Sequence, residues 1–140
     1  MSANLLRGPL CGFVARVPTV GTLLASGSAK NGVKLWSIPD GVQLDHVSPS
    51  LTIFSIAFSP AAPNLLAIGG NDGKKVPADG SAFQILKVDS ASSKLIRVFN
   101  DMAPADVTVA GLRDVRGVAW SNAGTMVATV GKYSEIRLYR

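Results

Sequence analysis

The sequence is poor in the residues that several common protein classes require. Its 140 residues include one cysteine, Cys11, one histidine, His46, and one glutamate, Glu135. A single cysteine excludes an intrachain disulfide and predicts an intracellular protein, cytoplasmic or nuclear. One residue each of these three types is too few for a zinc site or a catalytic triad. We therefore expect no metal, no cofactor and no enzymatic activity.

Helix-type surface residues are also scarce. Eight of the nine acidic residues are aspartates, whereas helical proteins usually carry many glutamates on their exposed faces. Fourteen glycines and eight prolines, together with frequent Val, Thr and Asp, favour strands joined by tight turns. No apolar run reaches the ~18–20 residues of a membrane span. The length predicts a single domain over residues 1–140.

Positive charge is modest and dispersed. Lys and Arg number 14 against nine acids, which gives a net charge of +5, and the only adjacent basic pair is Lys74-Lys75. Nucleic-acid binding usually needs a basic stripe or cluster. A basic surface for nucleic acid or an anionic membrane is therefore a disfavoured alternative.

Three segments, 13–28, 55–70 and 117–131, share one pattern. Each has an alternating strand, a turn containing Pro, Asn or Gly, and a second apolar strand that ends near Gly. A short third strand follows each segment, over 33–36, 83–86 and 136–139. Alternation places Val33 and Leu35 on one face of the sheet, and Lys34 and Trp36 on the other. The prediction is an all-β fold of antiparallel strands in three repeats, approximately 5–38, 45–88 and 107–140.

These motifs resemble the repeats of WD-repeat proteins. The stretch 24–36, Leu-Ala-Ser-Gly-Ser-Ala-Lys-Asn-Gly-Val-Lys-Leu-Trp, is similar to the family's repeat ending. Ser55-Ile-Ala-Phe-Ser-Pro60 and Val118-Ala-Trp-Ser121 are similar to its opening strand. The resemblance implies β-propeller blades, about three of them. Because propellers typically have about 4–8 blades, it implies a partial propeller.

The repeats depart from the family pattern at their turns. The family usually places Asp in the turn before the third strand, but Lys30 and Tyr133 stand there in the first and third repeats. Only the second repeat keeps a candidate, Asp72. The Gly-His pair that often opens a repeat is reduced to Asp45-His46, so His46 is expected to be a turn residue. Looser turns are expected as a result.

The resemblance implies a non-catalytic scaffold or adaptor that binds other proteins, as a subunit or fragment of a larger complex. Two insertions, 73–80 and 100–111, lengthen loops, and long loops on a rigid scaffold carry binding residues. The predicted partner-binding residues are Lys74, Lys75, Asp79, Asp101, Asp106, Arg113 and Arg116. The predicted repeat-core residues are Trp36, Phe58, Leu86, Trp120 and Tyr139.

Three blades leave the ring unclosed. Leu5 to Leu10 is a candidate closing strand, although Gly8-Pro9 weakens it. Open sheet edges invite pairing with other chains, so we expect either self-association or assembly with other proteins. A truncated propeller piece without independent function is the remaining alternative.

Overall fold

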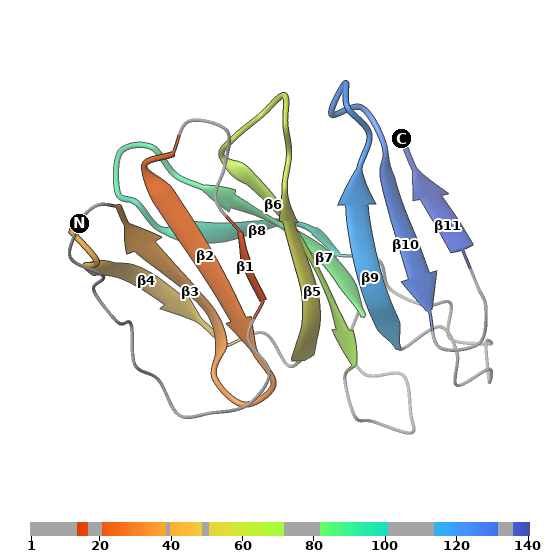
Figure 1. The fold of residues 1–140 in the computed structure, drawn as a ribbon, viewed down its shortest axis with the longest axis horizontal. Helices are drawn as coiled ribbons and strands as arrows, with labels where there is room; N and C mark the ends of the chain where they lie inside the picture. Colours follow the sequence, from red (N-terminus) through yellow and green to blue (C-terminus); the bar gives the residue numbers. More distant parts are fainter. Residues whose placement is uncertain are drawn as a thin grey trace, which may run out of the picture.

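The computed structural model describes residues 14–16, 21–38, 40–48, 51–71, 82–100, 114–131 and 136–140. Within these ranges all regular secondary structure is strand, arranged in three antiparallel sheets (Figure 1). The predicted all-β class is therefore confirmed. The candidate closing strand, Leu5 to Leu10, lies outside the described residues.

In each sheet the spatial order of the strands follows the chain. The first sheet contains β1 (Val14–Arg16), β2 (Leu23–Ser28), β3 (Gly32–Ser37) and β4 (Gln43–Val47). The second contains β5 (Thr52–Phe58), β6 (Leu65–Asn71), β7 (Phe83–Val88) and β8 (Leu95–Asn100). The third contains β9 (Val115–Trp120), β10 (Val127–Gly131) and β11 (Ile136–Tyr139). The first and second sheets continue past the predicted repeat ends at 38 and 88, because β4 and β8 add an outer strand to each.

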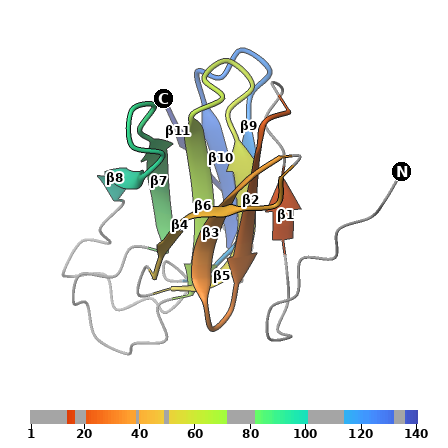
Figure 2. The same ribbon diagram turned by 90° about the vertical axis from the view of Figure 1, so that its left-hand side faces the viewer.

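The three sheets are stacked one behind another (Figure 2), so the middle sheet has a neighbour on each face. Strand β5 packs against β1 and β2 on one side and against β9 on the other. One apolar core lies between the first and second sheets, and includes Ala25, Val33, Leu35, Ile53, Ile56, Leu66, Ile68 and Leu86. The other lies between the second and third sheets, and includes Ala67, Phe83, Val115 and Val127.

Two glycines bring the sheets close together. Gly27 pairs with Val33 in the first sheet, and Gly69 pairs with Phe83 in the second. A Cβ atom on Gly27 would lie 2.6 Å from Ile53, and one on Gly69 would lie 2.5 Å from Val115. Any larger residue would push the next sheet's first strand away. Glycine at this repeated position therefore sets the spacing of the stack.

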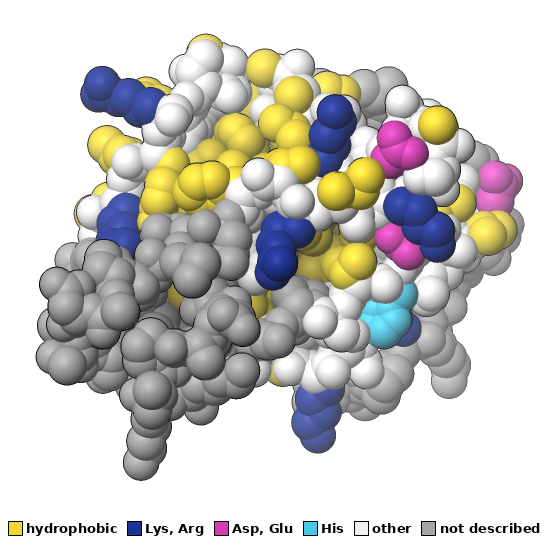
Figure 3. Space-filling view, turned by 180° about the vertical axis from the view of Figure 1, so that it is seen from behind, with side chains coloured by type: hydrophobic (Ala, Val, Ile, Leu, Met, Phe, Trp, Pro, Cys, Tyr) yellow, Lys and Arg dark blue, Asp and Glu magenta, His cyan; other side chains and the backbone are white. Residues whose placement is uncertain are grey.

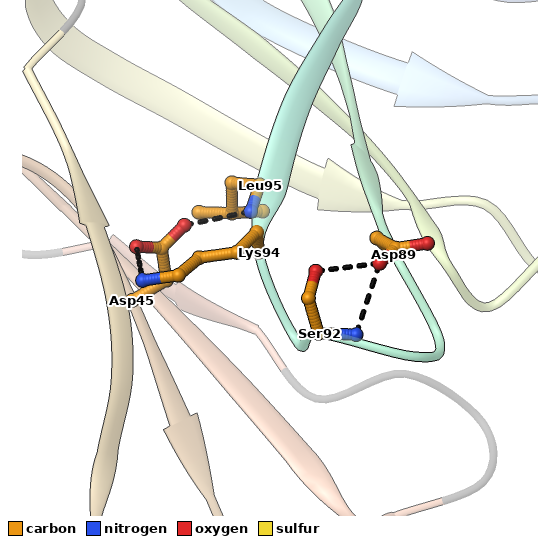
Figure 4. Close-up of polar contacts among 5 residues, drawn as sticks. All are labelled: Asp45, Asp89, Ser92, Lys94 and Leu95. Carbon is orange, nitrogen blue, oxygen red and sulfur yellow. Dashed lines mark hydrogen bonds and ion pairs between the residues drawn. The ribbon is translucent and has the colours of Figure 1, made fainter.

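A polar contact also joins the first two sheets at their outer strands (Figure 4). The backbone N–H of Leu95 donates to Asp45 Oδ2 at 2.7 Å, and Lys94 Nζ lies 3.3 Å from Asp45 Oδ1. Burial acts to raise the pKa of Asp45, but the hydrogen bonds and the Lys94 charge outweigh it and leave the pKa below its usual value. Because the Asp45 side chain is only 11% exposed, this contact fixes how β4 sits on β8.

The hairpin that carries Lys94 is itself tied by a side-chain contact. The hydroxyl and the backbone N–H of Ser92 both donate to Asp89 Oδ2, the latter at 2.9 Å (Figure 4). These bonds, with the hydroxyl contributing most, lower the pKa of Asp89. The turn between β7 and β8 therefore holds its shape beside the contact with the first sheet.

We expect the Asp45 contact to make stability depend on acid pH. A carboxyl whose folded-state pKa is lowered stabilises the fold fully above its ordinary value of 3.8, and this stabilisation is lost as the pH falls through the folded-state value. Asp45→Asn should cost about 1 kcal/mol at neutral pH and should lose less stability on acidification than the parent chain. Urea unfolding at pH 7 and at about pH 3 measures both effects. Asp40→Asn, at an exposed site, is the control, and an equal pH dependence of parent and Asp45→Asn would contradict the assignment.

The turn between β9 and β10 rests on the turn before β6. Gly124 has φ +66°, and a Cβ there would lie 2.5 Å from the Ala61 Cβ. Gly21 has a similar φ of +69° but open space around it. Gly21→Ala should therefore cost about 1 kcal/mol for backbone strain alone, whereas Gly124→Ala should cost about 1–3 kcal/mol more because of the clash. Equal losses in urea unfolding would show that the two turns do not support each other.

Candidate functional site

Most of the predicted partner-binding residues fall in two segments that the structure does not describe. Lys74, Lys75 and Asp79 lie in 72–81, and Asp101, Asp106 and Arg113 lie in 101–113, all outside the described residues. Arg116 is described and lies in β9. The candidate site is therefore built from the residues where these two segments join the sheets.

The two segments meet the sheets at one place. Asn71, the last residue of β6, forms an isolated antiparallel bridge with Asp114, which directly precedes β9. The side-chain amide of Asn71 donates to Asp114 Oδ2 at 3.2 Å. In the sequence, Asn71 directly precedes segment 72–81 and Asp114 directly follows segment 101–113. The structure thus joins the starting point of one predicted loop to the end point of the other.

Arg116 covers this junction. Its Nη2 donates to Asp114 Oδ2 at 2.8 Å, and its Nε contacts the second carboxylate oxygen. The Asp114 side chain is 5% exposed, whereas that of Arg116 is 49% exposed. The hydrogen bond and charge of Asp114 raise the pKa of Arg116. A buried carboxylate needs such a partner, and the charge-assisted Nη2 hydrogen bond orients the guanidinium over Asp114.

An aromatic ring completes the arrangement. The Arg116 guanidinium carbon lies 4.3 Å from the ring centroid of Phe54. Phe54 is the extra residue at an irregularity where β5 pairs with β6, and Arg116 is the extra residue where β9 pairs with β10. Such bulges redirect side chains. We call Phe54, Asn71, Asp114 and Arg116 the loop-root cluster. Its partly exposed guanidinium, stacked on an aromatic ring, is a surface suited to binding another protein.

Sequence reasoning identified only Arg116 among these four residues. Alternating patterns do not show where a strand bulges, so the proximity of Phe54 to Arg116 was not apparent. The Asn71–Asp114 pair is separated by 43 positions. The one available signal is that Asn71 ends one repeated apolar strand and Asp114 directly precedes another.

Of the predicted repeat-core residues, Trp36 lies apart from both cores. It is half-buried on the face of the first sheet that points away from the second. Its Nε1 donates to Ser26 Oγ at 2.9 Å, and Lys34 Nζ lies 5.8 Å from the ring centroid. The predicted pairing of Lys34 and Trp36 on one face, opposite Val33 and Leu35, agrees with these contacts.

The other four predicted core residues line the inter-sheet cores. Leu86 is buried between the first and second sheets, and Phe58 packs against that core. Trp120 and Tyr139 pack against the core between the second and third sheets. Trp120 Nε1 also donates to the backbone oxygen of Ala57 at 2.9 Å, which ties β9 to β5.

The turn before β3 is held without the aspartate of the family pattern. Ser28 Oγ accepts hydrogen bonds from the backbone N–H groups of Lys30 at 3.3 Å and Asn31 at 3.2 Å. His46 lies in β4 and not in a turn, and its ring contacts the backbone oxygen of Asn31. Asp72 and Tyr133 lie outside the described residues.

Surface charge in the described ranges is scattered. Seen from behind, Lys and Arg side chains stand apart from one another, with hydrophobic side chains gathered between them (Figure 3). The described residues contain no group of three or more side chains able to hold a metal ion. In the same part of the chain, no helix has the length and apolar character needed to cross a membrane.

No protein-family model and no curated protein matches the sequence. Solved structures do match. A chain in the crystal structure of the mitotic checkpoint complex matches with a TM-score of 0.67 and 18% identity, over 92% of this chain and 36% of that chain. The computationally designed Ika4 protein matches with a TM-score of 0.58 and 17% identity, over 89% of this chain and 62% of that one. The chain therefore spans less than two thirds of either. At these identities the likeness shows the fold, which is that of partial propeller blades.

We expect the loop-root cluster to stabilise the contact between the second and third sheets. Asp114→Ala should lower the free energy of unfolding by about 1–3 kcal/mol, because Asn71 and Arg116 lose a buried acceptor. Asp40→Ala, at an exposed site, should be nearly neutral. Urea unfolding compares the two. Arg116→Ala should also destabilise, and less so when Asp114 is already asparagine, because the buried charge is then gone.

Proposed function

We propose that the chain is a non-catalytic protein-interaction module of the WD-repeat type, acting as a subunit of a larger assembly. The stacked sheets supply a rigid frame, and the partner binds at the end where segments 72–81 and 101–113 join it. The propeller-like fold and the match to a chain of a multiprotein complex support a role in protein binding.

The observation that carries the proposal is the loop-root cluster. The Asn71–Asp114 bridge places the residue that precedes segment 72–81 beside the residue that follows segment 101–113. Arg116 presents a guanidinium there that is fixed by Asp114 and backed by Phe54. Arginine and aromatic side chains contribute a large share of the binding energy at protein interfaces. Lys74 and Lys75 follow Asn71 by three and four residues in the sequence, and we include their positive charge in the proposed site for that reason.

The test compares two charge-matched double variants. Lys74→Ala/Lys75→Ala removes two positive charges from the insertion. Lys87→Ala/Arg97→Ala removes two from exposed positions on β7 and β8, away from the loop-root cluster. Proteins captured by the immobilised chain are quantified by mass spectrometry, and thermal unfolding checks that both variants fold like the parent.

We expect at least one partner whose capture falls about tenfold with Lys74→Ala/Lys75→Ala, a loss of about 1.4 kcal/mol, and is unchanged with the control. Equal capture by both variants would contradict this site. If nuclease treatment or moderate salt removes the captured material from the parent chain, the nucleic-acid alternative replaces the proposal.

A further inference from the structure

The stack of sheets ends in two faces that no described sheet covers. On the third sheet, Ala128, Val130, Ile136 and Leu138 lie opposite the face that packs on the second sheet; we call this set end face 3. Ile136 is 70% exposed and Leu138 is 63% exposed. On the first sheet, Leu24, Ser26, Lys34 and Trp36 lie opposite the second sheet and are half-buried; we call this set end face 1.

End face 3 repeats the faces that are buried inside the stack. Ala128 pairs with Leu138 as Ala25 pairs with Leu35 and Ala67 with Ile85. Ala25 and Leu35 are fully buried against the second sheet, and Ala67 is fully buried against the third. At this pair of positions, the third sheet therefore exposes the same kind of residues that the first two sheets bury against a neighbouring sheet.

End face 1 repeats the complementary faces. Leu24 pairs with Trp36 as Leu66 pairs with Leu86 and Val127 with Tyr139. These equivalents on the second and third sheets are the apolar residues that pack onto the preceding sheet.

The polar residues of end face 1 also fit this pattern. Ser26 pairs with Lys34 as Ile68 pairs with Gln84 and Thr129 with Arg137. Gln84 and Thr129 are each only 3% exposed. A neutral polar side chain at this position is thus compatible with a buried sheet interface in this chain. For the charged Lys34 the precedent is Arg137, which occupies the equivalent position on the third sheet and is half-buried.

We infer that end face 3 of one molecule receives end face 1 of a second copy of this chain, and that two such contacts close a ring of six sheets. The contact continues the two sheet interfaces already present within the chain. Six sheets fall within the usual range of about 4–8 blades for a propeller. A head-to-tail contact must close on itself to give a discrete assembly, and two copies of the three described sheets provide this.

Val130 determines which residues of end face 3 can contact the second copy. It stands at the register position of Gly27 and Gly69, is 43% exposed, and covers Gly117 on the neighbouring strand. The Val130 side chain therefore keeps an incoming sheet further from β10 than the second sheet lies from β2 at Gly27, or the third from β6 at Gly69. The second copy must therefore make its main contact with Ile136 and Leu138 of β11.

The inference goes beyond the proposed function, because it involves neither the loop-root cluster nor the two insertions. A chain that stays monomeric would still bind its partner through those residues, and a dimer could lack any partner. The two proposals therefore fail separately.

The test uses the full 140-residue chain and light scattering after size exclusion. We expect a mass of two chains at about 100 μM. Leu138→Asp, in end face 3, and Leu24→Asp, in end face 1, should each reduce the mass to one chain. Ile96→Asp, at a 50% exposed site on the middle sheet, is the matched control and should remain a dimer. Circular dichroism checks folding, and Ser26→Glu replaces Leu24→Asp if that variant unfolds.

Mixing the two variants distinguishes the head-to-tail contact from any symmetric one. Leu138→Asp keeps an intact end face 1, and Leu24→Asp keeps an intact end face 3, so their equimolar mixture should regain a two-chain species. A parent chain that is monomeric overturns the inference. So does a Leu24→Asp variant that stays a dimer on its own, which would indicate pairing of end face 3 with itself, or a mixture that stays monomeric, which would show that the two intact faces do not bind each other. A parent series of larger species that grows with concentration would also overturn it, because it would indicate an open chain of copies.

Discussion

The close approach of neighbouring sheets is the constraint on which the rest of this structure depends. Each sheet must bury an apolar face against the next, and Gly27 and Gly69 permit that because any Cβ there would meet Ile53 or Val115 at 2.6 or 2.5 Å. The hydrophobic effect drives the stacking without specifying an orientation. The glycines set the spacing between neighbouring sheets, since the sheets must be placed so that the side chains between them fill the gap.

Polar contacts then fix the sheets against sliding. Asp45 joins the outer strands of the first and second sheets through the backbone of Leu95, and Trp120 joins the first strands of the second and third through the oxygen of Ala57. These groups are largely shielded from water, so each would be costly to leave unpaired. Each contact opposes sliding at its own interface, Asp45 between the first and second sheets and Trp120 between the second and third.

Much of the fold could be predicted from the sequence, because alternation and repeated turns are local signals. The face assignment of Val33, Leu35, Lys34 and Trp36 needed only the geometry of a strand. The outer strand β4 was not predicted, since Asp45 and His46 interrupt its apolar pattern. The loop-root cluster was mostly missed for a different reason: it depends on bulges at Phe54 and Arg116 and on a contact across 43 positions, and no local pattern encodes either.

The same repeat that builds the stack also separates the two interaction surfaces that we propose. A sheet that packs on both faces can bind nothing there, so binding residues can collect only at the strand ends or on the two terminal faces. Arg116 stands at the strand ends and is held by Asp114, whereas Ile136 and Leu138 stand on a terminal face. The first surface carries a charged pair at the strand ends, while the second is apolar and follows a repeated register. A protein partner and a further sheet therefore have different places to bind, and neither needs to displace the other.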